Sequence, residues 1–330
     1  MPTALITGIT GQDGSYLADL LLSKGWEVAG LVRRTSADNR WRVNHLEDRV
    51  QWLEGDLLDQ GSLIRAVQEC APDHVYNLAA QSFVGVSWRE PTHTAEVTGI
   101  GALRVLEAVR LVRPQARVYQ ASSSELFGNC PGPHSADGPF RPRSPYGSAK
   151  LFAHATAINY RESYDMFVSC GVLFNHESPR RGREFVTRKV CIAAARAALG
   201  DRSPLHLGNL EARRDWGWAP DFVDAMHRML DADAPSDHVV ATGVSHSVRD
   251  LASRAYATVG LNYEDFVVVD PKFLRPADVH VLIGDPEPAR QALGWSPTVD
   301  FNEMVRRMVE AEMHRLSVDP GLASQNGSSS

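Results

Sequence analysis

Residues 3–17 read TALITGITGQDGSYL, and this stretch decides the fold. Ala4–Thr7 is a short apolar run of the kind that forms a buried parallel strand, and Ser15–Lys24 has the apolar spacing of an amphipathic helix. The glycines between them, Gly8, Gly11 and Gly14, follow the spacing GxxGxxG. Such glycines permit a tight turn and let backbone N–H groups approach a pyrophosphate at the positive helix end. The stretch predicts a dinucleotide site, and the alternative is an ordinary tight βα turn.

The alternation of strands and helices continues from this stretch to residue 173. The predicted strands are Ala4–Thr7, Val28–Val32, Val50–Leu53, His74–Asn77, Val118–Gln120 and Val168–Leu173, and further helices are predicted at Ser62–Glu69 and Gly101–Leu111. This order is typical of an α/β fold with a doubly wound parallel sheet of Rossmann type.

After Asn175 the rhythm breaks into loops rich in arginine, proline and glycine, with helices predicted near Thr187–Leu199 and at Phe301–Leu316. We therefore expect a dinucleotide-binding domain over residues 1–175. Residues 176–330 are expected to form a smaller α/β cap that binds substrate, with some elements returning to the sheet and a disordered tail from about residue 321.

Composition narrows the functional classes. The chain has 330 residues, of which 43% are hydrophobic and 22% charged, as in a globular enzyme. Its scattered cysteines, Cys70, Cys130, Cys170 and Cys191, favour neither disulfides nor a metal site and fit a reducing cytoplasm. We find no signal-peptide pattern or membrane span, and the net charge of -6 argues against nucleic-acid binding.

The end of the second strand indicates which dinucleotide is bound. Arg33, Arg34, Thr35 and Ser36 stand where NAD enzymes place an acidic residue on the ribose. Guanidinium groups suit a 2′-phosphate, so NADP is favoured over NAD; alternatively, one arginine faces water or a neighbouring subunit. Other strand ends expected on this edge carry Asp56 and Leu57, and Leu78, Ala79, Ala80, Gln81 and Ser82. Asp56 could accept from the adenine amino group. The small side chains of Ala79 and Ala80 would let the chain run close to the cofactor, although packing alone would equally select small residues there.

The segment SPYGSAK at 144–150 contains Tyr-x-x-x-Lys, and Pro145 marks a helix start. Tyr146 and Lys150 then share one helix face. An ammonium about 4 Å from the phenol would lower its pKa by roughly three units, which makes Tyr146 a candidate base. The alternative is a surface Tyr/Lys pair.

The loop after the fifth strand carries Ser123 and Glu125. Ser123 can hydrogen-bond a substrate hydroxyl. A simple dehydrogenase with a tyrosine base has no need of Glu125, whereas a dehydratase needs a second group that accepts and donates a proton. From spacing alone, a solvated or capping role for Glu125 is equally acceptable.

A cluster of basic residues stands out in a chain whose net charge is negative. Its members are Arg180, Arg181, Arg183, Arg188 and Lys189, with Arg213 and Arg214 further on. This basic cluster indicates either a site for an anionic ligand or a solvated helix face.

At these residues the chain resembles the GDP-mannose 4,6-dehydratases of the extended short-chain dehydrogenase family. The matching strings include TGITGQDGSYLA, VRRTS, SSSELFG, SPYGSAK, LFNHESPRRG, LGNLEARRDWG and FLRPADV, and they cover most of the chain. The resemblance implies an NADP-dependent lyase that converts GDP-mannose to GDP-4-keto-6-deoxymannose and water. It implies that Ser123 is the active-site hydroxyl, Glu125 the acid/base, and Tyr146 and Lys150 the catalytic pair.

The resemblance also implies binding residues. Cofactor contacts fall on Gly8, Thr10, Gly11, Gln12, Asp13, Arg33–Ser36, Asp56, Leu57, Leu78–Ser82, Tyr146, Lys150, His176 and Arg181. Substrate contacts fall on Ser82, Ser123, Glu125, Tyr146, Asn175, Lys189, Arg214, Arg275 and Asp278. The chain departs from the family at His93, often Tyr, and at Asp278, often Glu. A homo-oligomer, dimeric or tetrameric, is expected.

Three alternatives stay open at this point. They are a dehydratase of another GDP-sugar, a reductase or epimerase acting on the 4-keto product, and a non-catalytic NADP-sensing regulator.

Overall fold

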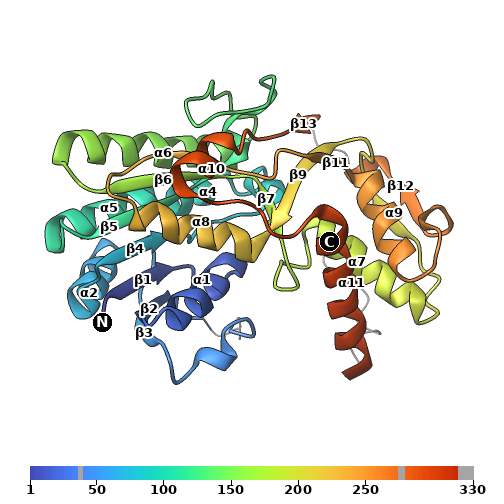
Figure 1. Ribbon diagram of the computed structural model, residues 1–330, viewed down its shortest axis with the longest axis horizontal. Coiled ribbons are helices and arrows are strands. Elements are labelled where there is room, and N and C mark those ends of the chain that lie inside the picture. The colour runs from blue at the N-terminus through green and yellow to red at the C-terminus, as the bar shows by residue number, and fades with distance from the viewer. Residues whose placement is uncertain (36–39, 274–278, 319–330) are drawn as a thin grey trace.

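The computed structural model describes residues 1–35, 40–273 and 279–318 (Figure 1). Ser36, Arg275, Asp278 and the predicted tail lie outside the described residues.

A seven-stranded parallel sheet forms the larger part of the molecule, with strand order β10-β6-β5-β4-β1-β2-β3. The strands are β1 (Thr3–Thr7), β2 (Glu27–Val32), β3 (Gln51–Glu54), β4 (His74–Asn77), β5 (Arg117–Ser123), β6 (Val168–Leu173) and β10 (His238–Val240). The predicted doubly wound sheet is confirmed. β5 runs to Ser123, beyond the predicted end at Gln120, because it pairs with β6 as far as Leu173. The order reverses around β1, and ligands of such sheets bind beyond the carboxyl ends of the strands at this point.

Helices cover both faces of the sheet (Figure 1). On one face α1 (Gln12–Ser23) packs on α8 (Ala219–Asp231), and Leu17, Leu21 and Met226 share one buried cluster. On the other face lie α2 (Gln60–Cys70), α5 (Gly101–Val112) and α6 (Pro145–Tyr164). The short helices α3 (Val84–Ser87) and α4 (Pro91–Thr94) and a π-helical stretch (Ala95–Ile100) join β4 to α5.

The smaller part, at the right of Figure 1, is built around β9 (Arg213–Trp218). Three short strands pair with β9: β7 (Asn175–Glu177), β11 (Ser245–Ser247) and β13 (Val281–Leu282). A separate pair is formed by β8 (Leu205–Leu207) and β12 (Val267–Val269). The helices are α7 (Val186–Ala198), α9 (Val248–Thr258) and α11 (Phe301–Val318), which pack together around a buried apolar cluster that includes Trp216 and Tyr256.

The second half of the chain contributes to the large sheet. α8 lies on the face that α1 covers, β10 extends the sheet beyond β6, and α10 (Glu287–Leu293) packs near both. The division into two domains at residue 175 therefore stays a proposal. Residues 219–240, which include α8 and β10, pack with the large sheet although they follow residue 175.

Three general features bear on chemistry. All four cysteines are buried free thiols. Within the described ranges, no helix is both long and apolar enough to cross a membrane. The same ranges hold no group of three or more His, Cys, Asp and Glu side chains placed to bind a metal ion.

Candidate active site

The glycine turn lies against the segment that follows β4. Gly8 has φ +73°, and a Cβ atom there would lie 2.8 Å from the backbone nitrogen of Ala79. Only glycine satisfies both the left-handed conformation and the close approach. Gly11 occupies the N-cap of α1 and has no side chain to bond the first N–H groups of the helix. Those groups remain available to an anionic ligand.

Two polar residues hold the turn and the segment 78–82 together. The Thr7 hydroxyl donates to Asn77 Oδ1 at 2.8 Å and accepts from the N–H groups of Leu78 and Ala79 at 3.1 and 3.2 Å. Asn77 Nδ2 in turn donates to Gln120 Oε1 at 2.8 Å. Our sequence reasoning treated Thr7 and Asn77 only as strand residues. Their signal was a polar side chain at the carboxyl end of a buried strand.

The rest of segment 78–82 is anchored by Gln81. Its backbone N–H donates to Thr98 Oγ1 at 3.1 Å, and its side-chain amide donates to the carbonyl of Phe83 at 3.1 Å. Ser82 is exposed, whereas Ala80 is half-buried. Ser82 is therefore exposed on a segment whose backbone is held in place by Gln81.

The predicted adenosine end lies beyond β2 and β3. Arg33, Arg34 and Thr35 are exposed where β2 ends. Asp56, after β3, accepts from the N–H of Leu58 through Oδ1 at 2.9 Å, and Leu57 is buried. These residues lie on neighbouring strand ends, as expected for one nucleoside pocket.

The predicted catalytic helix is α6, and local chemistry starts it at Pro145. Ser144 is the N-cap and accepts from the N–H of Gly147 at 3.0 Å. A Cβ atom on Gly147 would lie 2.8 Å from the carbonyl oxygen of Glu125. The absence of a side chain at 147 lets the first turn of α6 abut the segment that carries Ser123 and Glu125.

Four predicted catalytic residues meet at this seam between α6 and β5. The Tyr146 phenol lies beside the Ser123 hydroxyl, which accepts from the N–H of Glu125 at 3.2 Å. Lys150 Nζ donates to the carbonyl of Ala121 at 2.7 Å and lies 6.0 Å from the centroid of the Tyr146 ring. Tyr146, Ser123 and Lys150 are buried, and Glu125 is half-buried.

The ionisation of the pair differs from the expectation. Burial raises the pKa of Tyr146 to about 12, and the charge of Glu125 adds to the rise although the neighbouring Ser123 hydroxyl opposes it. Burial also lowers the pKa of Lys150 to about 8. The expectation that Lys150 by itself brings the phenol close to neutrality is therefore wrong for the polypeptide alone. The ammonium is directed at a carbonyl, and desolvation outweighs its charge.

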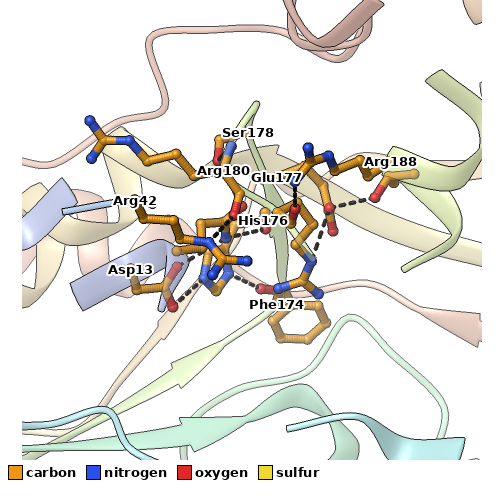
Figure 2. Close-up of polar contacts among 11 residues, drawn as sticks. Asp13, Arg42, Phe174, His176, Glu177, Ser178, Arg180 and Arg188 are labelled. Atoms are coloured by element: carbon orange, nitrogen blue, oxygen red, sulfur yellow. Dashed lines mark hydrogen bonds and ion pairs between the residues drawn. The ribbon is translucent and has the colours of Figure 1, made fainter. Parts of the chain in front are cut away.

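The predicted cofactor residues His176 and Asp13 touch each other. His176, in β7, lies 2.8 Å from Asp13 Oδ2 through Nε2 and 2.7 Å from the carbonyl of Phe174 through Nδ1 (Figure 2). Gln12 donates to the other Asp13 oxygen and to the carbonyl of His176, both at 3.0 Å. Ser178 donates to Gln12 Oε1 at 2.8 Å. The first turn of α1 is thereby bonded to the segment that follows β6.

Three arginines of the basic cluster form ion pairs with carboxylates of the protein. Arg180 NH1 lies 2.7 Å from Asp19 Oδ2, Arg181 Nε lies 3.2 Å from Glu177 Oε2, and Arg188 Nε lies 3.0 Å from Glu312 Oε1. Figure 2 shows several of these partners around β7. These three arginines hold neighbouring segments together and do not cover a solvated helix face, whereas contact of this cluster with an anionic ligand stays a prediction.

The residues predicted to hold a GDP-sugar are more dispersed. Asn175 is half-buried in β7, beside Trp216 of β9. Lys189 Nζ donates to the carbonyl of His206 at 2.9 Å, and buried Arg214 donates to the carbonyl of Val279 at 2.7 Å. Arg42, which the sequence analysis placed only within an arginine-rich loop at 33–42 that resembles a subunit-contacting loop of the family, donates to the carbonyls of Arg180 at 2.7 Å and Thr10 at 3.2 Å. No sequence signal distinguishes Arg42 from its arginine neighbours.

Known proteins resemble this chain in sequence and in fold. The sequence profile of the family "GDP-mannose 4,6 dehydratase" matches residues 5–308. The Arabidopsis thaliana protein named GDP-mannose 4,6 dehydratase 2 is 48% identical, covering 96% of this chain and 90% of that protein. The human GDP-mannose 4,6 dehydratase is 44% identical, covering 96% and 93%. The solved Thermus thermophilus UDP-glucose 4-epimerase complex with NAD aligns at a TM-score of 0.83 and 27% identity, covering 94% and 98%.

Proposed function

We propose that this chain, which belongs to the GDP-mannose 4,6-dehydratase family, converts GDP-mannose to GDP-4-keto-6-deoxymannose and water. The observation that carries the proposal is the seam between α6 and β5, where Tyr146, Ser123 and Glu125 lie together at the carboxyl edge of the sheet. A carboxyl group beside a hydroxyl-binding tyrosine is what an elimination requires and what a simple dehydrogenase or 4-keto reductase does not.

A nicotinamide dinucleotide fits the residues beside that seam. The turn at Gly8 lies close against Ala79, and the N-terminus of α1 has no side-chain cap. Such a cradle suits a pyrophosphate. We propose that Gly8–Asp13 hold the diphosphate, Asp56 and Leu57 the adenine, and segment 78–82 the rest of the dinucleotide.

NADP is proposed over NAD because Arg33 and Arg34 are exposed at the end of β2. Charge-assisted bonds to a 2′-phosphate would be lost when both are replaced by alanine, so NADP should weaken far more than NAD. Calorimetry with both dinucleotides tests this. Equal affinity of the unaltered protein for NAD and NADP would refute the assignment.

In the proposed mechanism the side chains of the site bind the sugar and transfer protons. Ser123 and Tyr146 bind the C4 hydroxyl, and Tyr146 takes its proton. When bound, an oxidised nicotinamide would supply positive charge beside the phenol, a hydride acceptor for C4 and, once reduced, a hydride donor for C6. Glu125 takes the proton from C5, which the C4 ketone has acidified, and gives a proton to the departing C6 hydroxyl. Water leaves. A solvent proton reaches C5 as hydride adds to C6, Tyr146 releases the proton that it took from the C4 hydroxyl, and the dinucleotide would end in its starting oxidation state.

Lys150 and the cap residues have supporting tasks in this proposal. Lys150 is fixed by the carbonyl of Ala121 and places positive charge near the phenol. Asn175, Lys189 and Arg214 are proposed to lie along the GDP moiety. Lys189 and Arg214 each donate to a main-chain carbonyl, and we propose that their positive charges attract the diphosphate.

The direct test is product identification. Purified protein incubated with GDP-mannose and NADP should yield a GDP-sugar lighter by one water, without net change in the dinucleotide. An unchanged sugar, or a product that differs by two hydrogens, would refute the dehydratase assignment.

A homo-oligomer in the cytoplasm is also proposed. Large apolar side chains are exposed on neighbouring helices: Phe152 and Tyr164 on α6 and Leu111 on α5. Such a patch favours contact with a second copy. Light scattering should give a mass of at least two chains.

A further inference from the structure

The two hydrogen bonds of His176 determine its protonation. Nδ1 faces the carbonyl oxygen of Phe174 at 2.7 Å, and Nε2 faces Asp13 Oδ2 at 2.8 Å (Figure 2). A carbonyl oxygen only accepts, so Nδ1 carries a hydrogen. Gln12 donates to the other oxygen of Asp13, as expected for a carboxylate. The arrangement is that of an imidazolium with both nitrogens protonated beside an ionised carboxylate.

The surroundings support this assignment. His176 is buried and stacks on Phe222 of α8, with ring centroids 4.5 Å apart. Burial opposes the charge on each group. The carboxylate nevertheless raises the pKa of His176 above its usual range, and the imidazolium and the hydrogen bonds hold the pKa of Asp13 at about 2. The other charged groups near His176 are Arg181 and Glu177, which lie 3.2 Å apart and compensate each other.

The position of Asp13 gives the pair its significance. Asp13 lies in the first turn of α1, where the free N–H groups and the helix dipole favour an anion. A lone carboxylate in that turn would repel a diphosphate. This carboxylate would also be attracted by the helix dipole, and so it would compete with the diphosphate for the positive potential of the helix N-terminus.

We propose that His176 is a charge-compensating positioning residue for the dinucleotide site. Its imidazolium neutralises Asp13, so that the first turn of α1 stays favourable for a diphosphate, and the bond fixes β7 to that turn. The inference rests on the dinucleotide site proposed above. It assigns His176 a role that depends on its charge toward Asp13, and the role is separable from any direct contact with the ligand.

A double-mutant cycle tests the proposal, with NADP as the probe and calorimetry as the measurement. His176→Gln keeps a donor toward Asp13 but removes the positive charge, so the Kd for NADP should rise about tenfold to fiftyfold. Adding Asp13→Asn to that variant removes the uncompensated carboxylate and should restore most of the affinity. The deficit of His176→Gln should also shrink as salt is raised, because screening weakens a repulsion between charges.

The matched control is Asp237→Asn, which breaks the partly buried pair between Asp237 and Arg161, 2.7 Å apart and distant in sequence from the glycine turn. It should lower stability without changing the Kd of the folded protein for NADP. If Asp13→Asn fails to restore affinity in the His176→Gln background, or if His176→Gln binds as the unaltered protein does, the proposal is overturned. A lack of NADP and NAD binding by the unaltered protein would instead overturn the dinucleotide site itself.

Discussion

Two buried seams of this molecule treat charge in opposite ways. At the seam between α6 and β5, Lys150 is 4% exposed and, in the described part of the chain, forms no ion pair; burial lowers its pKa to about 8 and raises that of Tyr146 to about 12. Around β7, buried groups meet opposite charges, and the pKa of Asp13 falls to about 2. Burial without a carboxylate partner brings the pKa of Lys150 toward neutrality, whereas burial with a partner keeps Asp13 ionised. The first seam suits proton transfer and the second suits support.

The largest effect should come from removing the proton acceptor of the first seam. Tyr146→Phe should lower kcat by about 10⁴-fold or more and abolish reduction of the dinucleotide, since the C4 proton has no acceptor. Steady-state turnover and near-ultraviolet absorbance check this. Tyr160→Phe, on the same helix but hydrogen-bonded to Glu107, is the matched control and should keep near-normal turnover. Comparable activity in both variants would remove Tyr146 from the chemistry.

Breaking a pair around β7 should mainly cost stability. Glu312→Gln leaves the Arg188 guanidinium, 3% exposed, without its carboxylate, and should lower the free energy of unfolding by about 3–5 kcal/mol. Urea titration measures the change. Replacing both partners, as Arg188→Met with Glu312→Leu, should recover most of that loss. A cost below about 1 kcal/mol for Glu312→Gln would mean that this seam does not depend on pairing.

Glu125→Gln should divide the reaction into its two stages. The amide keeps size and hydrogen bonding but cannot exchange a proton, so formation of the 6-deoxy product should fall about a hundredfold or more. Oxidation at C4 should persist, with reduced dinucleotide accumulating on the enzyme and little solvent deuterium entering C5. Near-normal formation of the 6-deoxy sugar would move the acid/base role to another group.

The smallest effect concerns the pH dependence of stability. Asp13 has a lowered pKa of about 2 against 3.8, so it stabilises above pH 3.8 and loses this contribution as pH falls through 2. His176 has a raised pKa, so it stabilises below pH 6.5 and loses this contribution as pH rises through its folded value. The difference in unfolding free energy between the unaltered protein and Asp13→Asn/His176→Gln should therefore be greatest between about pH 4 and 6.5, at about 1–2 kcal/mol. A difference independent of pH would contradict the pairing.

Local patterns predicted what depends on neighbouring residues. The apolar run at Ala4–Thr7 and the glycines after it fixed β1, the turn and α1, and Pro145 marked the start of α6. The placement of Tyr146 beside Ser123 also followed, because both stand at the carboxyl edge of one parallel sheet.

What the sequence did not predict depends on contacts between distant segments. Asp13 and His176 are separated by 163 positions, and Arg188 and Glu312 by 124. Hydrophobic periodicity does not reveal ion pairs between such distant residues, so the sequence left the basic cluster with two interpretations, a ligand site or a solvated helix face. The pKa of Tyr146 was also misjudged, since its environment depends on where Lys150 points and on how completely the seam excludes water.

The return of β10 to the large sheet has a consequence for synthesis on the ribosome. Residues 1–175 emerge first, but the face over α1 is completed by Phe222 and Met226 of α8, and β6 gains its outer neighbour only with Val239. Until roughly residue 240 has left the exit tunnel, the nascent sheet exposes both an apolar face and a strand edge, which are the features that chaperones recognise and that promote aggregation. A fragment ending at 175 should therefore be insoluble when expressed alone, whatever its glycine turn would bind.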